Sequence, residues 1–267
     1  MGSYRNEPNR EITERNRYMQ LSNRLQMAAS LIGEGYMLVD VGTDHGYVPI
    51  ALMEQGKISG AYALDIHPGP LERAMTHIQQ GGWNEKIIPV QSNGLRGLSA
   101  EKIVSPAALL IAGMGGGLMI SILEDSWDKV QRFERIVLSP HSDVENVRRF
   151  LYSKHMYIVQ EEMLKEDGKY YSFFVCINNK QSQYNQHNAG EVISEELICQ
   201  VEWKYGKYLL ENRNKVLLDY LQTQHRNLQA LQVNMIEAAK TSTRAKERLQ
   251  QVQGELCLNE RAMGYYK

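Results

Sequence analysis

An acidic residue occupies the centre of a short, glycine-bounded turn near the start of the chain. Gly42 and Gly46 enclose Thr43, Asp44 and His45, and the turn follows an apolar run. In a dinucleotide-binding turn a central glycine lets backbone amides close on a pyrophosphate at a helix start. A carboxylate there repels a diphosphate and attracts a cation. The turn therefore favours S-adenosylmethionine, which carries a sulfonium and an ammonium but no phosphate, over NAD or ATP.

The segments around this turn predict a strand, a tight turn and a helix. Residues 36–41 are apolar enough for a buried parallel strand, and residues 48–53 can open an amphipathic helix. Asp40 lies near the end of that strand, so we expect it and the two glycines of the turn to contact the donor. An alternative role for Asp44 is to cap the following helix.

The next strand is expected at residues 61–64 and closes on Asp65, about 25 residues beyond Asp40. An acid at this tip binds the ribose hydroxyls of a nucleoside in open α/β folds. Asp65 is therefore a candidate donor ligand together with the adjacent Ile66. Asp65 fits equally well as the cap of a helix that begins near Pro68, and the two roles are compatible.

Polar or glycine-rich stretches follow the third and fourth expected strands. The strand at 87–91 leads into Ser92-Asn93-Gly94-Leu95, whose side chains can reach an adenine amino group. The strand at 107–111 runs into Gly113-Met114-Gly115-Gly116-Gly117, at the carboxyl edge where ligands bind in such sheets. Glycines allow donor and substrate to approach the backbone closely. We expect the donor to contact Asn93, Gly94, Gly113, Met114 and Gly115, and the substrate to contact Gly116.

The last strands distinguish this fold from a plain Rossmann domain. A fifth strand at 135–138 ends in Ser139-Pro140-His141-Ser142-Asp143, which adds Pro140 and His141 as substrate candidates. Residues 157–163 and 170–177 flank Glu166-Asp167-Gly168-Lys169, a typical hairpin turn. A parallel sheet that ends in an antiparallel hairpin is the outline of an α/β, class I S-adenosylmethionine-dependent methyltransferase.

The chain divides into three expected parts. Residues 1–18 are polar and aperiodic, which predicts a flexible arm. Residues 19–180 form the Rossmann-like methyltransferase domain, and residues 191–267 a helical coiled-coil domain. The boundary is expected where the chain turns to Asn, Gln and Ser, between Asn178 and Gly190.

Apolar residues in the C-terminal part alternate in steps of three and four, which is coiled-coil spacing. Thr241-Ser242-Thr243 can cap a new helix, so we favour two antiparallel helices that fold back on each other. The alternative is a dimerising coiled coil, and a monomer is the preferred expectation. The expected seam consists of Leu217, Leu221, Leu228, Leu231, Met235, Ala238, Ala245, Leu249, Val252 and Leu256.

Composition excludes several classes of protein. The net charge of −1 gives no indication of a nucleic-acid partner. Residues 201–267, however, carry eleven Lys and Arg against seven Asp and Glu, 11 − 7 = +4. That excess is compatible with phosphate contacts and also with a solvated helical face. No apolar run is long enough to cross a bilayer and no signal peptide is present, so we expect a cytoplasmic protein. The three cysteines have no paired spacing and no cluster has metal-ligand spacing, so we expect neither disulfide nor metal.

Several of these motifs together resemble a known family. Leu21-Ser22-Asn23-Arg24-Leu25, Asp40 to Pro49, Ser92-Asn93-Gly94-Leu95 and Ile111 to Gly116 occur in this order before a helical C-terminal part. They are similar to the bacterial tRNA (adenine-22-N1)-methyltransferases, the TrmK family. The resemblance covers most of the chain. The chain departs from the family at Ser139-Pro140-His141-Ser142, where Gln-Pro-Asn is more usual, although Pro140 is retained.

The resemblance implies methyl transfer from S-adenosylmethionine to N1 of an adenine in the D-arm of tRNA. It also implies a Rossmann-like catalytic domain and a coiled-coil domain that helps to hold the tRNA. Basic residues of that domain are then substrate candidates, and we select Lys204, Lys207, Arg244 and Arg248.

Adenine N1 has an in-plane lone pair, so its attack on a sulfonium methyl needs alignment more than a strong base. The product is cationic, and a carboxylate such as Asp44 would stabilise the developing charge or bind the ammonium group of the donor. His45 and Tyr47 can stack on the adenine or pack against the sheet edge. Arg24 can bind phosphate, orient Asp44 or remain a surface residue.

Other methyl acceptors fit less well. Cytosine C5 chemistry needs a cysteine at the active edge, and none of the three cysteines lies at the tip of the fourth or sixth expected strand. Exocyclic amino methylation usually pairs Asn or Asp with Pro-Pro-aromatic, where this chain has Gly-Met-Gly-Gly. A methyltransferase of another RNA or of a small molecule, and a non-catalytic donor-binding RNA-binding protein, remain as alternatives.

Overall fold

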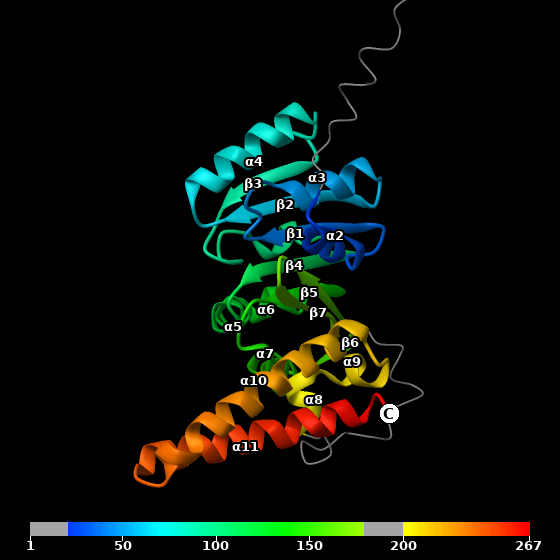
Figure 1. Cartoon of the computed structure of the whole chain (residues 1–267). Helices are drawn as coiled ribbons and strands as arrows, with labels where there is room; N and C mark the ends of the chain where they lie inside the picture. The colour runs from blue at the N-terminus through cyan, green and yellow to red at the C-terminus, as the bar shows by residue number, and fades with distance from the viewer. Residues whose placement is uncertain (1–20, 179–199) are drawn as a thin grey trace, which may run out of the picture.

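The computed structural model describes residues 21–178 and 200–267. A seven-stranded sheet runs through the first of these ranges, with helices on both faces and a helical part at one end (Figure 1). The expected fold class is confirmed. The strands lie in the order β3 (Ile87–Gln91), β2 (Ile58–Asp65), β1 (Tyr36–Val41), β4 (Ala107–Met114), β5 (Arg135–Pro140), β7 (Lys169–Asn178) and β6 (Met156–Glu166).

The first five strands are parallel, and β7 is antiparallel to both of its neighbours, β5 and β6. The register pairs Asp40 of β1 with Leu110 of β4 and Val41 with Ile111. It also pairs Asp65 at the end of β2 with Gln91 of β3. The parallel pairing therefore brings the carboxyl ends of β1, β2, β3, β4 and β5 to one edge of the sheet.

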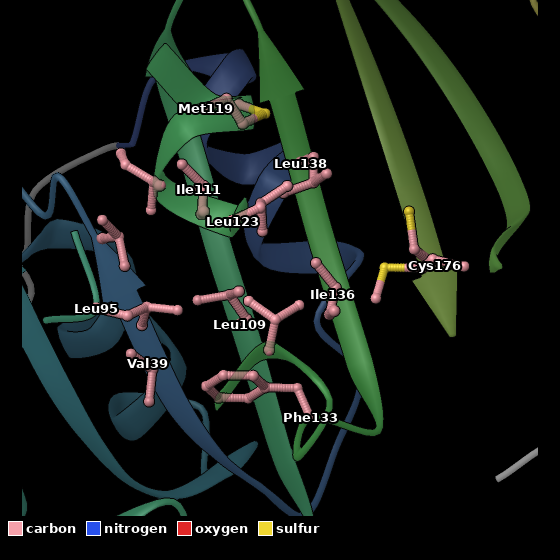
Figure 2. Close-up of a cluster of buried hydrophobic side chains, with 14 of the residues drawn as sticks. Val39, Leu95, Leu109, Ile111, Met119, Leu123, Phe133, Ile136, Leu138 and Cys176 are labelled. Carbon is pink, nitrogen blue, oxygen red and sulfur yellow. The ribbon is translucent and has the colours of Figure 1, made fainter. Parts of the chain in front are cut away.

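Alternate residues of the central strands face opposite sides, and both sides are buried. Val39 and Leu109 pack against α5 (Gly116–Asp125), α6 (Trp127–Val130) and α7 (Val144–Ser153). Figure 2 shows this cluster, with side chains of β1, β4, β5, β7 and α5. Leu38 and Leu110 face α2 (Asn23–Ser30), α3 (Tyr47–Glu54) and α4 (Pro68–Gln80). The near-continuous apolar runs in the sequence reflect this double burial.

Several strands extend further than the sequence pattern predicts, and β2 and β4 illustrate the reasons. β2 begins at Ile58, because Gly60 still pairs with Met37 of β1 although Ser59 and Gly60 interrupt the apolar run. β4 continues to Met114, which pairs with Pro140 of β5 after a register shift between Ala112 and Met114. The expected hairpin is confirmed.

The C-terminal part contains four helices, α8 (Gln200–Tyr205), α9 (Lys207–Glu211), α10 (Lys215–Ala239) and α11 (Thr243–Gly264), in the range that the structure describes. α10 and α11 are antiparallel, because Asn214 contacts Tyr266 and Leu221 contacts Asn259. Ser242 caps α11 by accepting a hydrogen bond from the amide of Ala245, as expected. The helical hairpin lies at the β6 end of the sheet (Figure 1). The predicted boundary at residues 178–190 lies almost entirely outside the described residues.

The apolar seam between α10 and α11 is shorter than the heptad spacing predicts. Leu217, Leu221 and Leu228 are buried, whereas Leu231 is 37% exposed and Ala238 is exposed. A buried Asn259 interrupts the apolar contact and donates its side-chain amide to the carbonyl of Leu221. The pair is therefore a helical hairpin with a well-packed base and a loosely packed tip.

Cys176 is buried in the sheet core and Cys257 is exposed, and both are free thiols; Cys199 falls outside the described residues. Within residues 21–178 and 200–267, no helix is long and apolar enough to cross a membrane.

A buried ion pair between α7 and β6 also hydrogen-bonds to the helical part. Nε of Arg148 on α7 lies 2.8 Å from Oε1 of Glu161 on β6, and both side chains are almost fully buried. Arg148 also donates to the carbonyl of Trp203 on α8, and Glu161 accepts a hydrogen bond from the amide of Tyr208 on α9. Gly206, which separates α8 from α9, has φ +95° and leaves no room for a Cβ beside Glu161. These contacts fix α8 and α9 against α7 and β6.

We expect Arg148→Met to lower the free energy of unfolding in urea by roughly 3–5 kcal/mol, because it leaves the Glu161 carboxylate buried without its cation. Arg148→Met/Glu161→Gln should be less destabilised, since the amide oxygen can still accept from Tyr208. The control is Arg96→Met, which removes an exposed pair with Asp125 and should cost less than about 1 kcal/mol. Equal losses in the two single variants would show that the buried pair does not anchor the helical part.

Candidate functional site

The turn after β1 is tied to the end of β2. The amides of Gly42 and Thr43 donate to the carbonyl of Leu64 over 2.8 and 3.0 Å. Asp40 lies beneath the turn at 5% exposure, and the hydroxyl of Thr43 donates to its Oδ2 over 2.7 Å. Burial raises the pKa of Asp40 to about 7; the Thr43 hydrogen bond opposes this shift and the charge of Asp65 adds to it. A carboxyl in this state gains from a cationic ligand.

Asp44 points away from this buried acid toward solvent. It has φ 51° and a side chain 67% exposed, with Oδ1 3.4 Å from Nε2 of His45 and 3.8 Å from Nη2 of Arg73. It does not cap α3, whose N-cap is Gly46 without a side-chain bond. Arg73 on α4 is therefore the arginine beside Asp44, and the expectation that Arg24 orients Asp44 does not agree with this geometry.

His45 and Tyr47 form an aromatic group with His77 of α4. The His45 and Tyr47 rings stack with centroids 4.9 Å apart, and His77 lies 5.7 and 5.3 Å from them. Nδ1 of His77 is 3.0 Å from the carbonyl of His45. His77 is absent from the sequence-based candidates, because no spacing connects it to a turn 32 residues earlier.

The tips of β2 and β3 carry the residues expected to hold a nucleoside. Oδ1 of Asp65 accepts from the amide of His67 over 2.9 Å, and His67, not Asp65, is the N-cap of α4. Ile66 is 49% exposed beside it. Asn93 is exposed, whereas Gly94 is buried with φ +57° and has no space for a Cβ beside Ile122. Asp65, Ile66 and Asn93 thus lie on the surface of the carboxyl edge.

The glycine-rich loop after β4 contacts the first turn directly. A Cβ on Gly42 would meet the terminal methyl group of the flexible Met114 side chain, so it is mainly the φ of +75° that favours glycine there. Gly113 occupies the register shift of β4 and is exposed with φ +80°. Gly115 is half-buried, and Gly116 is buried, with its amide bonded to the carbonyl of Ser142. Gly116 therefore serves close packing, which does not favour the expected substrate contact.

The loop after β5 places His141 over Gly113. Pro140 is buried, and the amide of His141 donates to the carbonyl of Met114 over 2.8 Å. Nε2 of His141 lies 3.2 Å from Nη1 of Arg24. Partial burial lowers the pKa of His141, and the charges of Arg24 and Lys169 lower it further.

Tyr171 of β7 completes this group and was not a sequence-based candidate. The guanidinium of Arg24 lies 5.4 Å from the centre of its ring, and the His141 ring meets it edge-on at 5.5 Å. The three side chains come from α2, the β5 loop and β7, so that only the fold brings them together.

The basic candidates of the helical part are mostly paired. Lys204 and Arg248 lie 3.9 and 3.6 Å from the carboxylate of Glu255, and Lys207 lies 3.8 Å from Glu211. Arg244 is exposed at the start of α11. None of these four belongs to the carboxyl edge of the sheet.

The two acids of the carboxyl edge, Asp40 and Asp65, suit a cationic nucleoside. In the part of the chain that the structure describes, no group of three His, Cys, Asp or Glu residues is placed to bind a metal ion. The buried carboxyl of Asp40 and the surface carboxyl of Asp65 offer acceptors for an ammonium group and a ribose. The turn at Gly42 lies against Met114, and the turn at Gly113 lies against Arg24 and His141; the lack of side chains on these glycines permits both close approaches.

Residues 21–174 match the model of a family described as methyltransferase domain. The tRNA (adenine(22)-N(1))-methyltransferase of Bacillus subtilis strain 168 is 31% identical over 224 residues, which is 84% of this chain and 89% of that protein. Two crystal structures have similar folds. One is the Streptococcus pneumoniae putative tRNA (m1A22) methyltransferase in complex with S-adenosyl-L-methionine. It is 27% identical in sequence, the match covers 91% of this chain and 100% of the S. pneumoniae chain, and the TM-score is 0.76. The other is the B. subtilis m1A22 tRNA methyltransferase TrmK. It is 28% identical in sequence, the match covers 91% of this chain and 99% of the TrmK chain, and the TM-score is 0.73. The chain therefore belongs to the family of tRNA (adenine(22)-N(1))-methyltransferases.

Proposed function

We propose that this protein transfers a methyl group from S-adenosylmethionine to N1 of adenine 22 in the D-arm of tRNA. The observation that carries the proposal is the edge formed by Asp40, Asp65 and the two glycine turns, in a chain of this family. The donor, when bound, supplies a methyl group whose bond to sulfur breaks as its bond to adenine N1 forms, so that positive charge moves from sulfur to the base.

The donor is assigned to the β1, β2 and β4 ends of the edge. Asp40 accepts from the ammonium group, directly or through a bound water, and its buried carboxyl is then ionised. Asp65 binds the ribose hydroxyls. The backbones of the glycine turns border the methionine part, and the exposed side chains border the adenine. The complete donor set is Asp40, Gly42, Gly46, Asp65, Ile66, Asn93, Gly94, Gly113, Met114 and Gly115.

The acceptor base is assigned to the other side of the Gly113 loop. Adenine N1 has a free lone pair, so the site has to align the base and expose N1 more than it has to remove a proton. The exposed carboxylate of Asp44 stabilises the positive charge that the base acquires. The stacked group of His45, Tyr47 and His77 offers ring faces on which a base can stack.

The tRNA backbone is assigned to the helical hairpin. Arg244 is exposed and Arg248 is half-exposed on the same helix, α11. Arg248, Lys204 and Lys207 each have a carboxylate within 4 Å, so Arg244 is the first candidate. The protein is expected to act as a monomer, and a tRNA substrate is consistent with work in the cytoplasm.

The wild-type protein should convert labelled S-adenosylmethionine and unmodified tRNA into 1-methyladenosine that mass spectrometry maps to the D-arm. Asp44→Ala and Asp44→Asn should both slow this transfer by about ten- to a hundredfold, because they remove the charge that stabilises the cationic base. The control is Asp125→Asn, which changes an exposed acid on α5 that pairs with Arg96. Unchanged transfer in both variants would remove Asp44 from the mechanism. Loss of donor affinity in calorimetry would move Asp44 to the donor side.

The buried acid gives a pH dependence of stability. An unfolded chain ionises Asp40 near the ordinary value of 3.8, whereas the folded carboxyl holds its proton to about pH 7. Folding free energy is therefore lost as the pH rises between these values, and the loss is complete above them. From pH 5 to pH 8 the unfolding free energy of the donor-free wild type should fall by about 2 kcal/mol more than that of Asp40→Asn.

Urea unfolding at both pH values checks this expectation, and Asp40→Asn should also weaken donor binding in calorimetry. Parallel pH profiles for the two proteins would contradict the assignment of Asp40 as a buried, neutral carboxyl.

Charge reversal tests the hairpin as the tRNA-binding part. Arg244→Glu/Arg248→Glu should lower tRNA affinity by about tenfold and reduce the salt dependence of binding by the equivalent of about two phosphate contacts. The matched control is Lys57→Glu/Lys86→Glu, which reverses two charges at the amino ends of β2 and β3. Filter binding over a salt series measures both. Equal effects of the two double variants would exclude a specific role for the hairpin.

A further inference from the structure

The contact between Arg24 and His141 fixes the protonation of the histidine ring. A guanidinium has only donors, so Nε2 of His141, 3.2 Å from Nη1 of Arg24, must be the acceptor. A neutral imidazole with an accepting Nε2 carries its proton on Nδ1. In residues 21–178 and 200–267, Nδ1 has no hydrogen-bond partner, so the ring presents an unused N–H donor.

The surroundings of Arg24 restrict where its side chain can lie. The face of Tyr171 lies 5.4 Å below its guanidinium. The helix that carries it starts with Asn23, whose amide donates to Oε1 of Glu166 over 2.7 Å. Gly113 passes beneath, and a Cβ there would lie 3.3 Å from Nη1 of Arg24. Arg24 is thus a restrained side chain and not a free surface cation.

The position of His141 allows its N–H group to reach the target base. His141 follows β5 and lies against Gly113 at the register shift of β4, next to the part of the edge to which we assign the acceptor base. An N–H donor at this point can bind a ring nitrogen of the target base other than N1. Adenine has two such acceptors, N3 and N7, and a bond to either leaves the lone pair of N1 free.

We propose that His141 is a substrate-positioning residue that donates its Nδ1 hydrogen to N3 or N7 of the target adenine, and that Arg24 and Tyr171 position it by holding the Nδ1–H tautomer. The proposal rests on the proposed function for the identity of the base. The tautomer itself is a property of the free protein and is tested without substrate.

Proton uptake by His141 would place two cations in contact and break the bond to Arg24. The charged and titratable groups that face the ring are Arg24 from α2 and Lys169 and Tyr171 from β7, and Asp143 lies two residues further along its own loop. Burial, Arg24 and Lys169 all lower the pKa of His141, so the neutral ring persists to lower pH than for an ordinary histidine. Removal of the Arg24 charge should therefore shift the acid limb of kcat/KM to higher pH.

Nitrogen-15 NMR of the full-length, histidine-labelled protein at pH 7.5 tests the tautomer directly, with His141→Asn identifying the signal. The wild type should show Nδ1–H, and Arg24→Met should show a shift toward Nε2–H with a higher pKa. Arg96→Met, which removes an exposed arginine that pairs with Asp125, should change neither the signal nor the acid limb. Circular dichroism and urea unfolding establish that Arg24→Met is folded. An Nε2–H or charged His141 in the wild type would overturn the proposal.

Two conservative variants distinguish the contribution of Nδ1 from that of Nε2. His141→Asn keeps a donor near Nδ1, whereas His141→Gln keeps a polar group near Nε2 and loses that donor. We expect kcat/KM for tRNA to be close to that of the wild type for the first and roughly three- to tenfold lower for the second. Tyr171→Phe should retain activity because it keeps the ring under Arg24, and Tyr171→Leu should not. Equal losses in His141→Asn and His141→Gln would contradict a donor role.

Transcripts with 3-deazaadenosine or 7-deazaadenosine at position 22 identify the acceptor. The wild type should have a lower kcat/KM for one of these two transcripts, and His141→Gln should cause no further loss with that transcript. If His141→Gln lowers kcat/KM by its full factor with each of the two transcripts, the proposed contact is overturned. If the wild type methylates no tRNA at all, the proposed function fails and so does the role toward the base. The NMR result would then still decide whether Arg24 sets the tautomer.

Discussion

The parallel register of β1 with β2 and β4 is the constraint on which the catalytic edge depends. It pairs Asp40 with Ala63 on one side and with Leu110 on the other, so that the turn after β1 lies against the loop after β4. A shift of one residue would turn Asp40 to the opposite face and separate Gly42 from Met114. Because both faces of these strands are buried, such a shift would also expose apolar side chains. The double burial of the sheet therefore sets the geometry of the site.

The site is not built for stability. Asp40 is a buried carboxyl whose only short hydrogen bond among the described residues comes from Thr43, and no cation of the described chain lies within 4 Å of it. Asp44 and Gly113 have left-handed backbone conformations, and Asp44 does so without the freedom of glycine. Such features persist when the surrounding structure imposes them, and they concentrate at functional sites. Each of them lies at the edge to which we assign the cationic donor and the acceptor base.

Local patterns were sufficient for the sheet and for its acidic tips. Apolar runs of strand length, each followed by Asp65, Ser92-Asn93-Gly94 or a glycine cluster, placed five strands and the carboxyl edge correctly. Patterns failed where a contact joins distant segments. Tyr171 meets Arg24 across 147 positions of sequence, and neither residue has a local signal for the other. The Arg148–Glu161 pair and Gly206 were missed for the same reason, since a charged residue in a strand gives no indication of its partner. The heptad spacing overestimated the seam toward the tip of the hairpin, where Leu231 and Ala238 are exposed although their spacing fits the repeat.

Methyl transfer to two tRNA transcripts that differ only in adenine or guanine at position 22 tests the central claim most directly. Single-turnover rates with labelled S-adenosylmethionine would be measured for both under identical conditions. The account predicts stoichiometric 1-methyladenosine in the first transcript and no incorporation in the second, because guanine carries a proton on N1. Equal incorporation into both transcripts, or none into the adenine transcript despite donor binding, would contradict it.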